Sequence, residues 1–435
     1  MSIDFTKRLG LALLTTSVAL AASSTPAIAD SLSPDMRAAT LLPTVLLGQA
    51  ALAEERREPA GHALRASLSR EEADRAIALL TAERFRSIER QDRGALAAKA
   101  ITLGDRTLRW ESKVFGAVPP GGHSLWISLH GGGNAPPAVN DQQWRNQISL
   151  YEPAEGIYLA PRAPTDTWNL WHEAHIDPLL QRLIDAQVAI NGVDPNRVYI
   201  LGYSAGGDGV WQLAPRMADR FAAAAMMAGH PGDASLLPLR NLPFAIFMGG
   251  EDAAYDRNRL AAEKTAEMTR LHSADPGGYV SMSRIYPGLP HWMNRRDAEA
   301  LPWMAQFTRD PWPTRLVWVQ DDVRNDRFYW LQIPPDASVR PGVRMDARVD
   351  EQTIALTGDV PPGTALRLSD RLVDLDRPIR VTVNGRKAFE GRVMRTAEAI
   401  RASLRERADP GSAATAILRL GTASAKRPPA APRNQ

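Results

Sequence analysis

The chain has 435 residues, of which 44% are hydrophobic and 23% charged. This composition is typical of a soluble globular protein and excludes collagen, coiled coil and whole-chain disorder. Lysine plus arginine (52) nearly balance aspartate plus glutamate (49), which argues against a dedicated nucleic-acid surface, and the lack of cysteine excludes disulfides, thiolate metal sites and cysteine nucleophiles.

The first 29 residues have the three-part pattern of a secretory signal. Lys7 and Arg8 precede an apolar run over residues 9–22, and Ala27-Ile28-Ala29 supplies the small residues of a cleavage site. The run holds 14 residues, fewer than the roughly 20 that a membrane span needs. We therefore expect export to a periplasm or out of the cell, with no stable membrane insertion of the mature protein.

Residues 30–99 are rich in Ala, Leu, Arg and Glu, and they predict a helical N-terminal segment. Ser69 and Glu72 have the spacing of a capping box at the start of one helix. The sequence leaves three roles open for this segment, namely a cap over a cleft, a removable pro-segment or a support for assembly.

Residues 100–310 alternate short apolar runs with amphipathic helical stretches. Asp177 and Pro178 fit the cap and first turn of one helix, a second helix follows Ser204, and a third covers residues 258–271. Buried strands are expected at 124–129, 156–159, 197–201, 221–228, 242–248 and 279–285. Strands separated by helices of this length predict an α/β fold, with a mostly parallel sheet and helices on both faces.

Residues 311–420 change to alternating strands and predict a small β-rich C-terminal module. Asn384-Gly385 is a strong hairpin signal, and a helix is expected near 396–407. Beyond Trp330 the only aromatic residue is Phe389, so a structural or interface role is favoured over carbohydrate binding. The last residues, 421–435, are rich in Pro, Ala and Arg and predict a disordered tail.

The segment from Gly202 to Gly206 fits the pattern G-x-S-x-G and lies between a predicted buried strand and a predicted helix. A serine on so sharp a strand-to-helix turn needs small residues two positions to either side, because the strand and the helix approach closely there. Gly202 and Gly206 meet that requirement. Ser204 is therefore the candidate nucleophile.

A serine hydroxyl becomes a good nucleophile only when a base takes its proton and a third group orients that base. If the chain order is Ser, acid, His, only His272 and His291 lie beyond the acid. His272 falls at the end of a helix, whereas His291 lies in a loop after a strand, so we predict His291 as the general base. Asp252, just past a strand end, is favoured as the acid over its neighbours Glu251 and Asp256.

The run His130-Gly131-Gly132-Gly133 follows the first of the predicted strands. Backbone N–H groups can stabilise a developing oxyanion only where side chains do not block the approach, and glycines provide that exposure. We expect oxyanion-hole donors from Gly132 and Ala205, with Gly131 as a further candidate.

Aromatic residues lie beside several of these loops, and Trp168, Trp171 and Trp292 are candidates for a wall against the substrate. The stretch 168–175 also contains two histidines, but it lacks the H-E-x-x-H spacing of a zinc-binding helix. No metal site is predicted, and the chemistry requires no cofactor.

Together, the HGGG loop, the G-Y-S-A-G turn, the strand-end Asp252 and the late His291 resemble the α/β-hydrolase superfamily. They are similar to secreted feruloyl esterases and polyhydroxybutyrate depolymerases. The resemblance covers residues 100–309, and it implies a serine esterase mechanism on a small-molecule or polymeric ester, with Ser204, Asp252 and His291 in the catalytic roles. The chain departs from the disulfide-bonded members of these groups because it has no cysteine.

Two other functions remain open at this point. A serine peptidase of the prolyl-oligopeptidase type shares the same set of site residues, although such enzymes usually carry a large propeller for which this chain has no room. A catalytically inactive binding protein of the same fold is the second alternative, and it predicts no acylation of the serine.

Overall fold

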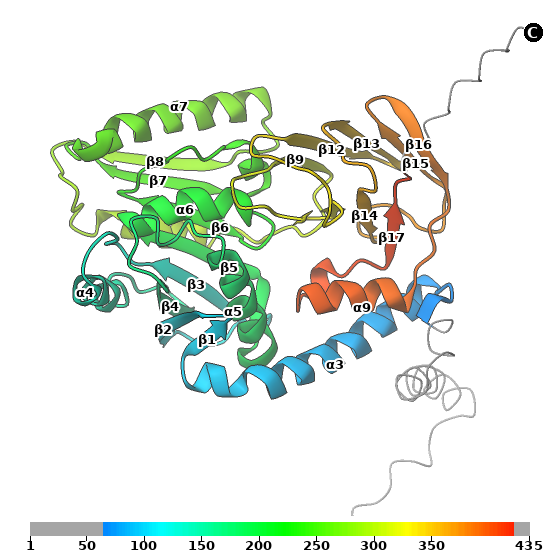
Figure 1. The fold of residues 1–435 in the computed structure, drawn as a ribbon, viewed down its shortest axis with the longest axis horizontal. Coiled ribbons are helices and arrows are strands. Elements are labelled where there is room, and N and C mark those ends of the chain that lie inside the picture. Colours follow the sequence, from blue (N-terminus) through cyan, green and yellow to red (C-terminus); the bar gives the residue numbers. More distant parts are fainter. Residues whose placement is uncertain (1–63, 422–435) are drawn as a thin grey trace, which may run out of the picture. The chain divides into compact units, whose positions relative to one another are not determined.

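A computed structural model describes residues 64–421 of the chain (Figure 1). The predicted signal at 1–29, the start of the helical segment and all but the first residue of the predicted tail lie outside the described residues. Within the described range, none of the helices combines the length and hydrophobicity that a membrane span requires.

The described part begins with a long helix, α3 (Arg70–Ala97). The Ser69 hydroxyl accepts a hydrogen bond from the Glu72 N–H, and the Glu72 carboxylate accepts one from the Ser69 N–H, so the predicted capping box is confirmed. Along its length α3 contacts both the helix α5 (Ile176–Asn191) and the helix α9 (Ala397–Glu406) (Figure 1). It therefore braces two parts of the chain that are distant in sequence.

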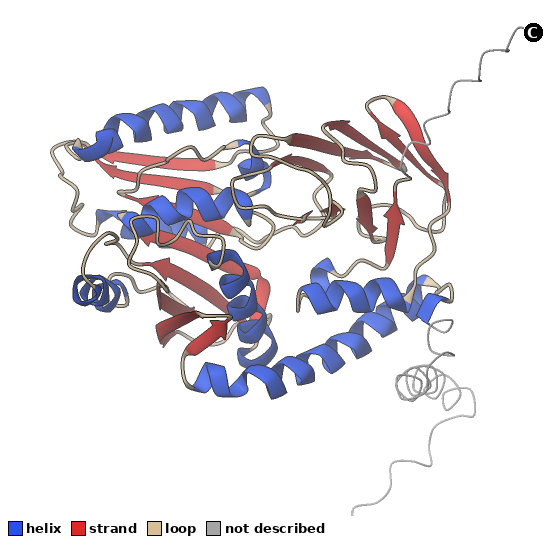
Figure 2. Cartoon of the chain, viewed as in Figure 1, coloured by secondary structure: helices blue, strands red, loops and turns tan. Residues whose placement is uncertain are grey.

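The central element is an eight-stranded sheet with the order β1-β2-β4-β3-β5-β6-β7-β8 (strands are red in Figure 2 and labelled in Figure 1). Strands β3 to β8 run parallel, whereas β1 and β2 are antiparallel. This order and these directions are those of the α/β-hydrolase fold, so the predicted fold class is confirmed. The strands are β1 (Ala100–Leu103), β2 (Arg106–Phe115), β3 (His123–Leu129), β4 (Gly156–Arg162), β5 (Val193–Tyr203), β6 (Ala223–Met227), β7 (Phe244–Gly249) and β8 (Ser281–Tyr286).

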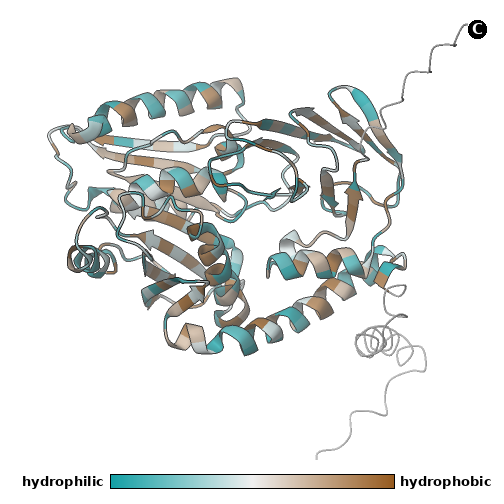
Figure 3. Cartoon of the chain, in the orientation of Figure 1, coloured by the Kyte–Doolittle hydropathy of each residue, from teal (hydrophilic) through white to brown (hydrophobic). Residues whose placement is uncertain are grey.

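Both faces of this sheet are covered. Alternate side chains of a strand point to opposite faces, and Ile127 accordingly enters one core with residues of α5, α6 and α7, while its neighbour Trp126 enters a second core with residues of α8. Hydrophobic residues gather in the central strands, whereas α7 is mostly hydrophilic (Figure 3). The remaining helices here are α4 (Pro137–Gln147), α6 (Ala205–Arg216), α7 (Arg257–Ala274) and α8 (Ala300–Met304).

Two predictions about this region are wrong. Helix α5 begins at Ile176 with His175 as its N-cap, and Asp177 lies in the first turn, where its carboxylate accepts from Arg216 at 2.9 Å instead of capping the helix. The strand expected at 279–285 is β8, which lies at the edge of the sheet and is only partly buried. Strands β1 and β2 were not predicted.

The C-terminal module contains two further sheets and α9. The predicted hairpin at Asn384-Gly385 joins β15 (Ile379–Val383) to β16 (Arg386–Gly391). A five-stranded sheet has the order β16-β15-β13-β12-β9, and a four-stranded sheet has the order β10-β11-β14-β17. The strands are β9 (Arg315–Val319), β10 (Arg327–Phe328), β11 (Leu331–Gln332), β12 (Arg344–Asp350), β13 (Thr353–Gly358), β14 (Ala365–Leu368), β15 (Ile379–Val383), β16 (Arg386–Gly391) and β17 (Ala416–Arg419).

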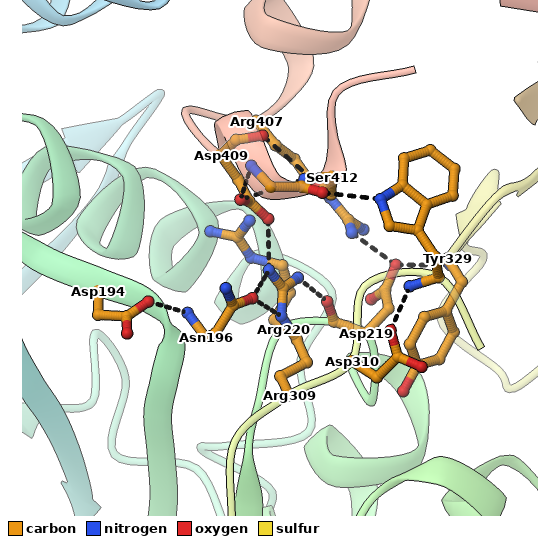
Figure 4. Close-up of polar contacts among 12 residues, drawn as sticks. Asp194, Asn196, Asp219, Arg220, Arg309, Asp310, Tyr329, Arg407, Asp409 and Ser412 are labelled. Carbon is orange, nitrogen blue, oxygen red and sulfur yellow. Dashed lines mark hydrogen bonds and ion pairs between the residues drawn. The ribbon is translucent and has the colours of Figure 1, made fainter. Parts of the chain in front are cut away.

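Buried ion pairs join this module to the eight-stranded sheet domain (Figure 4). Arg309, in the linking segment, pairs with Asp409 of the module at 2.5 Å and donates to the backbone oxygen of Asp219 at 2.6 Å. The Asp219 carboxylate pairs with Arg407 at 2.6 Å and accepts from the Tyr329 N–H at 2.9 Å. We call this set the junction network.

Candidate active site

Ser204 lies between β5 and α6 in a strained backbone conformation, with φ 57° and ψ −123°. A side chain on Gly202 would place its Cβ 2.2 Å from the Gly206 oxygen, and one on Gly206 would place its Cβ 2.1 Å from the Leu129 oxygen. Both positions therefore need glycine. The Ser204 N–H donates to the Met227 oxygen at 2.9 Å, which ties the turn to the neighbouring strand β6.

The three predicted side chains come together at one edge of the sheet. His291 Nε2 lies 3.0 Å from Ser204 Oγ, and His291 Nδ1 lies 2.6 Å from Asp252 Oδ2. A carboxylate can only accept, so Nδ1 carries the proton in this pair and Nε2 is left as the acceptor facing the serine hydroxyl. Asp252 is buried, whereas His291 is partly exposed.

The rival residues lie elsewhere. Asp256 is exposed and pairs with Arg259 at 3.1 Å, and Glu251 is exposed. His272 Nδ1 lies 2.7 Å from the Gly278 oxygen, at the far end of α7.

Tyr203, next to the serine, anchors the histidine loop. Its hydroxyl donates to the His291 oxygen at 2.6 Å and accepts from the Met293 N–H at 3.1 Å. Burial raises the pKa of the Tyr203 phenol, so the group stays protonated and keeps donating. This contact of Tyr203 was not predicted; the only signal for it in the sequence is its position within the G-x-S-x-G motif.

The glycine loop, residues 131–133, lies against Ser204. A Cβ on Gly131 would be 3.0 Å from the Ser204 Cβ and 3.7 Å from its Oγ. The Gly133 N–H donates to Asn140 Oδ1 at 2.8 Å, whereas the N–H groups of Gly131 and Gly132 have no acceptor within residues 64–421. As the first residue of α6, Ala205 also has an N–H without an intrahelical partner.

His130 holds this loop in place. Its Nδ1 lies 2.6 Å from the Gly131 oxygen, its Nε2 accepts from the Ala163 N–H at 3.1 Å, and its backbone oxygen accepts from the Trp171 indole at 2.9 Å. Burial lowers the pKa of His130 to about 4. The ring is therefore neutral near pH 7 and acts as a structural clamp.

Of the three tryptophans predicted to line a substrate wall, one is buried and two are exposed. Trp171 is fully buried beneath the glycine loop, so its expected place in a substrate wall is wrong. Trp168 and Trp292 are 68% and 43% exposed, and Tyr255, which was not predicted, is 78% exposed. Among the described residues these three are the exposed large aromatic side chains, and all three lie on loops that follow sheet strands.

Comparison with known proteins gives structural neighbours only. No protein-family model and no curated protein matches the chain. A thermostable esterase aligns with 22% identity over 48% of this chain and 62% of its own, with a TM-score of 0.36. A feruloyl esterase module from Clostridium thermocellum aligns with 16% identity over 48% and 86%, and the poly(3-hydroxybutyrate) depolymerase LpqC from Bordetella parapertussis with 17% over 46% and 89%, both with TM-scores of 0.34.

Ser204 thus lies on the strand-to-helix turn of a sheet whose order is that of the α/β-hydrolase fold, within hydrogen-bond distance of His291. The chain has the α/β-hydrolase fold and is similar to solved esterases.

Proposed function

We propose that the protein is an exported serine hydrolase that cleaves carboxylic esters through an acyl-enzyme. The observation that carries the proposal is the continuous hydrogen-bonded chain from Ser204 through His291 to the buried Asp252. A serine activated in this way attacks carbonyl carbon. Gly131 lies beside Ser204, and the N–H groups of Gly131 and Gly132 have no acceptor within residues 64–421, so they are free to bind an oxyanion.

In the proposed reaction His291 Nε2 takes the hydroxyl proton as Ser204 Oγ attacks the ester carbonyl. The carbonyl oxygen becomes an oxyanion, which accepts hydrogen bonds from the N–H groups of Gly132 and Ala205, with Gly131 as a further donor. His291 then gives its proton to the leaving alcohol, and an acyl group remains on Ser204. Water attacks this acyl-enzyme, again with His291 as the base, and releases the acid and free serine.

Asp252 stays ionised throughout and holds the imidazole in the tautomer that faces the serine. No step needs a metal or an organic cofactor. We propose Trp168 and Trp292 as substrate contacts, because their exposed rings lie on loops at the edge of the sheet that carries the catalytic residues.

The test uses protein without residues 1–29 and a fluorophosphonate probe that phosphonylates activated serines. Wild-type protein is expected to be labelled at Ser204, and Ser204→Ala is expected to lose labelling and to reduce aryl-ester hydrolysis by at least about 1,000-fold. Ser149→Ala, which removes an exposed serine hydroxyl outside the site, is the matched control. An intact Ser204→Ala protein with wild-type esterase activity would contradict the proposal.

Two further measurements separate the rival functions and test export. Faster turnover of peptide anilides than of aryl esters would favour a peptidase, and no labelling of the wild type would favour a binding protein. Secretion of the full chain, with cleavage after Ala29, is the expected result for the proposed signal.

A further inference from the structure

The buried carboxylate of Asp252 uses its two oxygens differently. Oδ2 accepts from His291, while Oδ1 lies 3.6 Å from Nη1 of Arg257. The Asp252 side chain is 2% exposed and that of Arg257 is 13% exposed. Since a buried charge is costly unless it is paired, the nearby guanidinium stabilises the Asp252 carboxylate at this place.

A strained turn brings Arg257 back onto Asp252. Two consecutive residues, Tyr255 and Asp256, have left-handed backbones with φ 57° and 58°, a conformation that is costly for residues other than glycine and is retained mainly where the surroundings require it. Asn258 closes the turn, because its N–H donates to the backbone oxygen of Asp252 at 3.0 Å and its side chain donates to the backbone oxygen of Gly250 at 2.8 Å. The strain thus places the first residue of α7 beside the acid.

The guanidinium itself is held on two sides. Its Cζ lies 4.9 Å from the centre of the Tyr255 ring, and its Nη1 donates weakly to the Ala254 oxygen at 3.4 Å. Its Nε is buried without a hydrogen-bond partner within residues 64–421. The guanidinium therefore makes few hydrogen bonds, and we infer that Arg257 acts mainly through its positive charge.

A second carboxylate shares this cation. Asp208 lies in the first turn of α6, and its Oδ1 accepts from the His230 N–H at 2.6 Å. Burial raises the pKa of Asp208, while the charges of Arg257, His230 and His291 act in the opposite direction. The charge of Arg257 thus lowers the pKa of Asp208, while its guanidinium lies beside Asp252.

We propose that Arg257 is a positioning residue, which fixes the Asp252 carboxylate against His291. This inference rests on the proposed function. Without the cation, the Asp252 carboxylate loses a contact that holds it in place, and His291 loses its orientation toward Ser204. Both acylation and deacylation are expected to slow, because His291 acts as the base in each step. Arg257 itself does not touch the reacting atoms.

The experiment compares Arg257→Gln and Arg257→Met, which remove the charge, with Arg257→Lys, which keeps it. Both neutral variants are expected to lower kcat for an aryl acetate on the order of 100-fold, as a small misplacement of a catalytic group does, with KM within about 2-fold of the wild type. The lysine variant is expected to recover about 10-fold of the loss, since its charge is retained but its planar fork is not. Arg259→Gln is the matched control, because Arg259 lies on the same helix but is exposed and pairs with Asp256 and Glu263.

Four outcomes would overturn the inference. Unchanged kcat in the neutral variants removes the positioning role, and a change in KM alone makes Arg257 a substrate contact. If kcat falls equally in the glutamine, methionine and lysine variants, and in parallel with Tm, the role of Arg257 is purely structural. Failure of the probe to label wild-type Ser204 overturns the proposed function and this inference together, whereas labelling with unchanged kcat in the neutral variants overturns the inference alone.

Discussion

At the scale of single residues, the histidine loop depends on one phenol. Tyr203 ends β5, and its hydroxyl joins the His291 oxygen to the Met293 N–H. The ring also lies edge-on to the imidazole, with centroids 5.8 Å apart. The Tyr203 hydroxyl therefore helps to hold His291 within hydrogen-bond distance of Ser204.

We expect Tyr203→Phe to reduce both kcat and stability. The substitution leaves the Met293 N–H and the His291 oxygen without their partner, a loss of about 1–3 kcal/mol for a buried polar group, and it frees the loop that holds His291. Urea unfolding and steady-state ester hydrolysis measure the two effects.

Tyr286→Phe is the comparison, because the Tyr286 hydroxyl likewise contacts the Arg296 oxygen at 3.0 Å and Glu299 at 2.6 Å. It is expected to lower stability while kcat stays near the wild-type value. If the two variants lose kcat equally, Tyr203 has no special role in positioning the base.

At the scale of elements, the glycine loop after β3 is pinned by a neutral histidine. Burial lowers the pKa of His130 to about 4 from its ordinary value of 6.5. In the unfolded chain the His130 imidazole therefore binds a proton below about pH 6.5, whereas in the folded protein it does so only below about pH 4. Stability is full above pH 6.5 and falls as the pH drops through this window.

The free energy of unfolding should thus decrease between pH 6.5 and pH 4, with about 3 kcal/mol of the change due to His130. His172, whose pKa burial also lowers to about 4, adds to the same slope. Urea titrations of the wild type and of His130→Gln across this range measure the difference. The variant is expected to have a shallower pH dependence, and identical slopes would show that His130 titrates normally in the folded state.

The sequence predicted the central elements better than the edges of the sheet. Strands buried on both faces, such as β5 and β7, are continuous apolar runs in sequence. Strand β2 alternates buried residues with Arg, Glu and Lys, because one face of this antiparallel strand is exposed, and it was missed. The same reason explains why β8 differs from the buried strand that was expected.

The candidate site shows a similar division. Ser204, Asp252 and His291 could be selected because each follows a strand of one parallel sheet, and carboxyl ends of such strands meet at one edge. The roles of Tyr203 and Arg257 depend on contacts across loops that no local pattern encodes. The burial of Trp171 depends in the same way on its packing under the glycine loop, so an aromatic near a motif gave the wrong prediction there.

At the scale of the whole molecule, the junction network ties the C-terminal module to the sheet domain. The side chains of Arg309 and Asp409 are 2% and 1% exposed. The pairing with Arg309 holds the pKa of Asp409 well below its ordinary value, although burial acts against this. A carboxyl with a lowered pKa contributes stability above its unfolded pKa near 3.8, and that contribution is lost as the pH falls toward the folded pKa.

Asp409→Asn is expected to destabilise the protein by about 3–5 kcal/mol at pH 7, because it leaves the guanidinium of Arg309 buried without its counter-charge. The amide oxygen can still accept the hydrogen bonds that Asp409 Oδ1 receives from Gly411 and Ser412 at 3.0 and 3.3 Å. The amide NH2 then stands in place of Oδ2 and cannot accept from Arg309, so the ion pair and its hydrogen bond are lost together. Urea unfolding from pH 7 to pH 3 should show that the difference in the free energy of unfolding between variant and wild type becomes smaller in acid.

Asp346→Asn is the matched control, since Asp346 pairs with Arg344 at the surface of the same module and exposed pairs contribute about 0–1 kcal/mol. Unfolding can be followed with one probe in the sheet domain and one in the module. If the junction network makes the two parts a single cooperative unit, both probes should report the same transition in the wild type and in Asp409→Asn. Separate transitions in the wild type, or a loss in Asp409→Asn no larger than in Asp346→Asn, would mean that the module is only loosely attached. The hydrolase fold would then owe its stability to its own core and to α3.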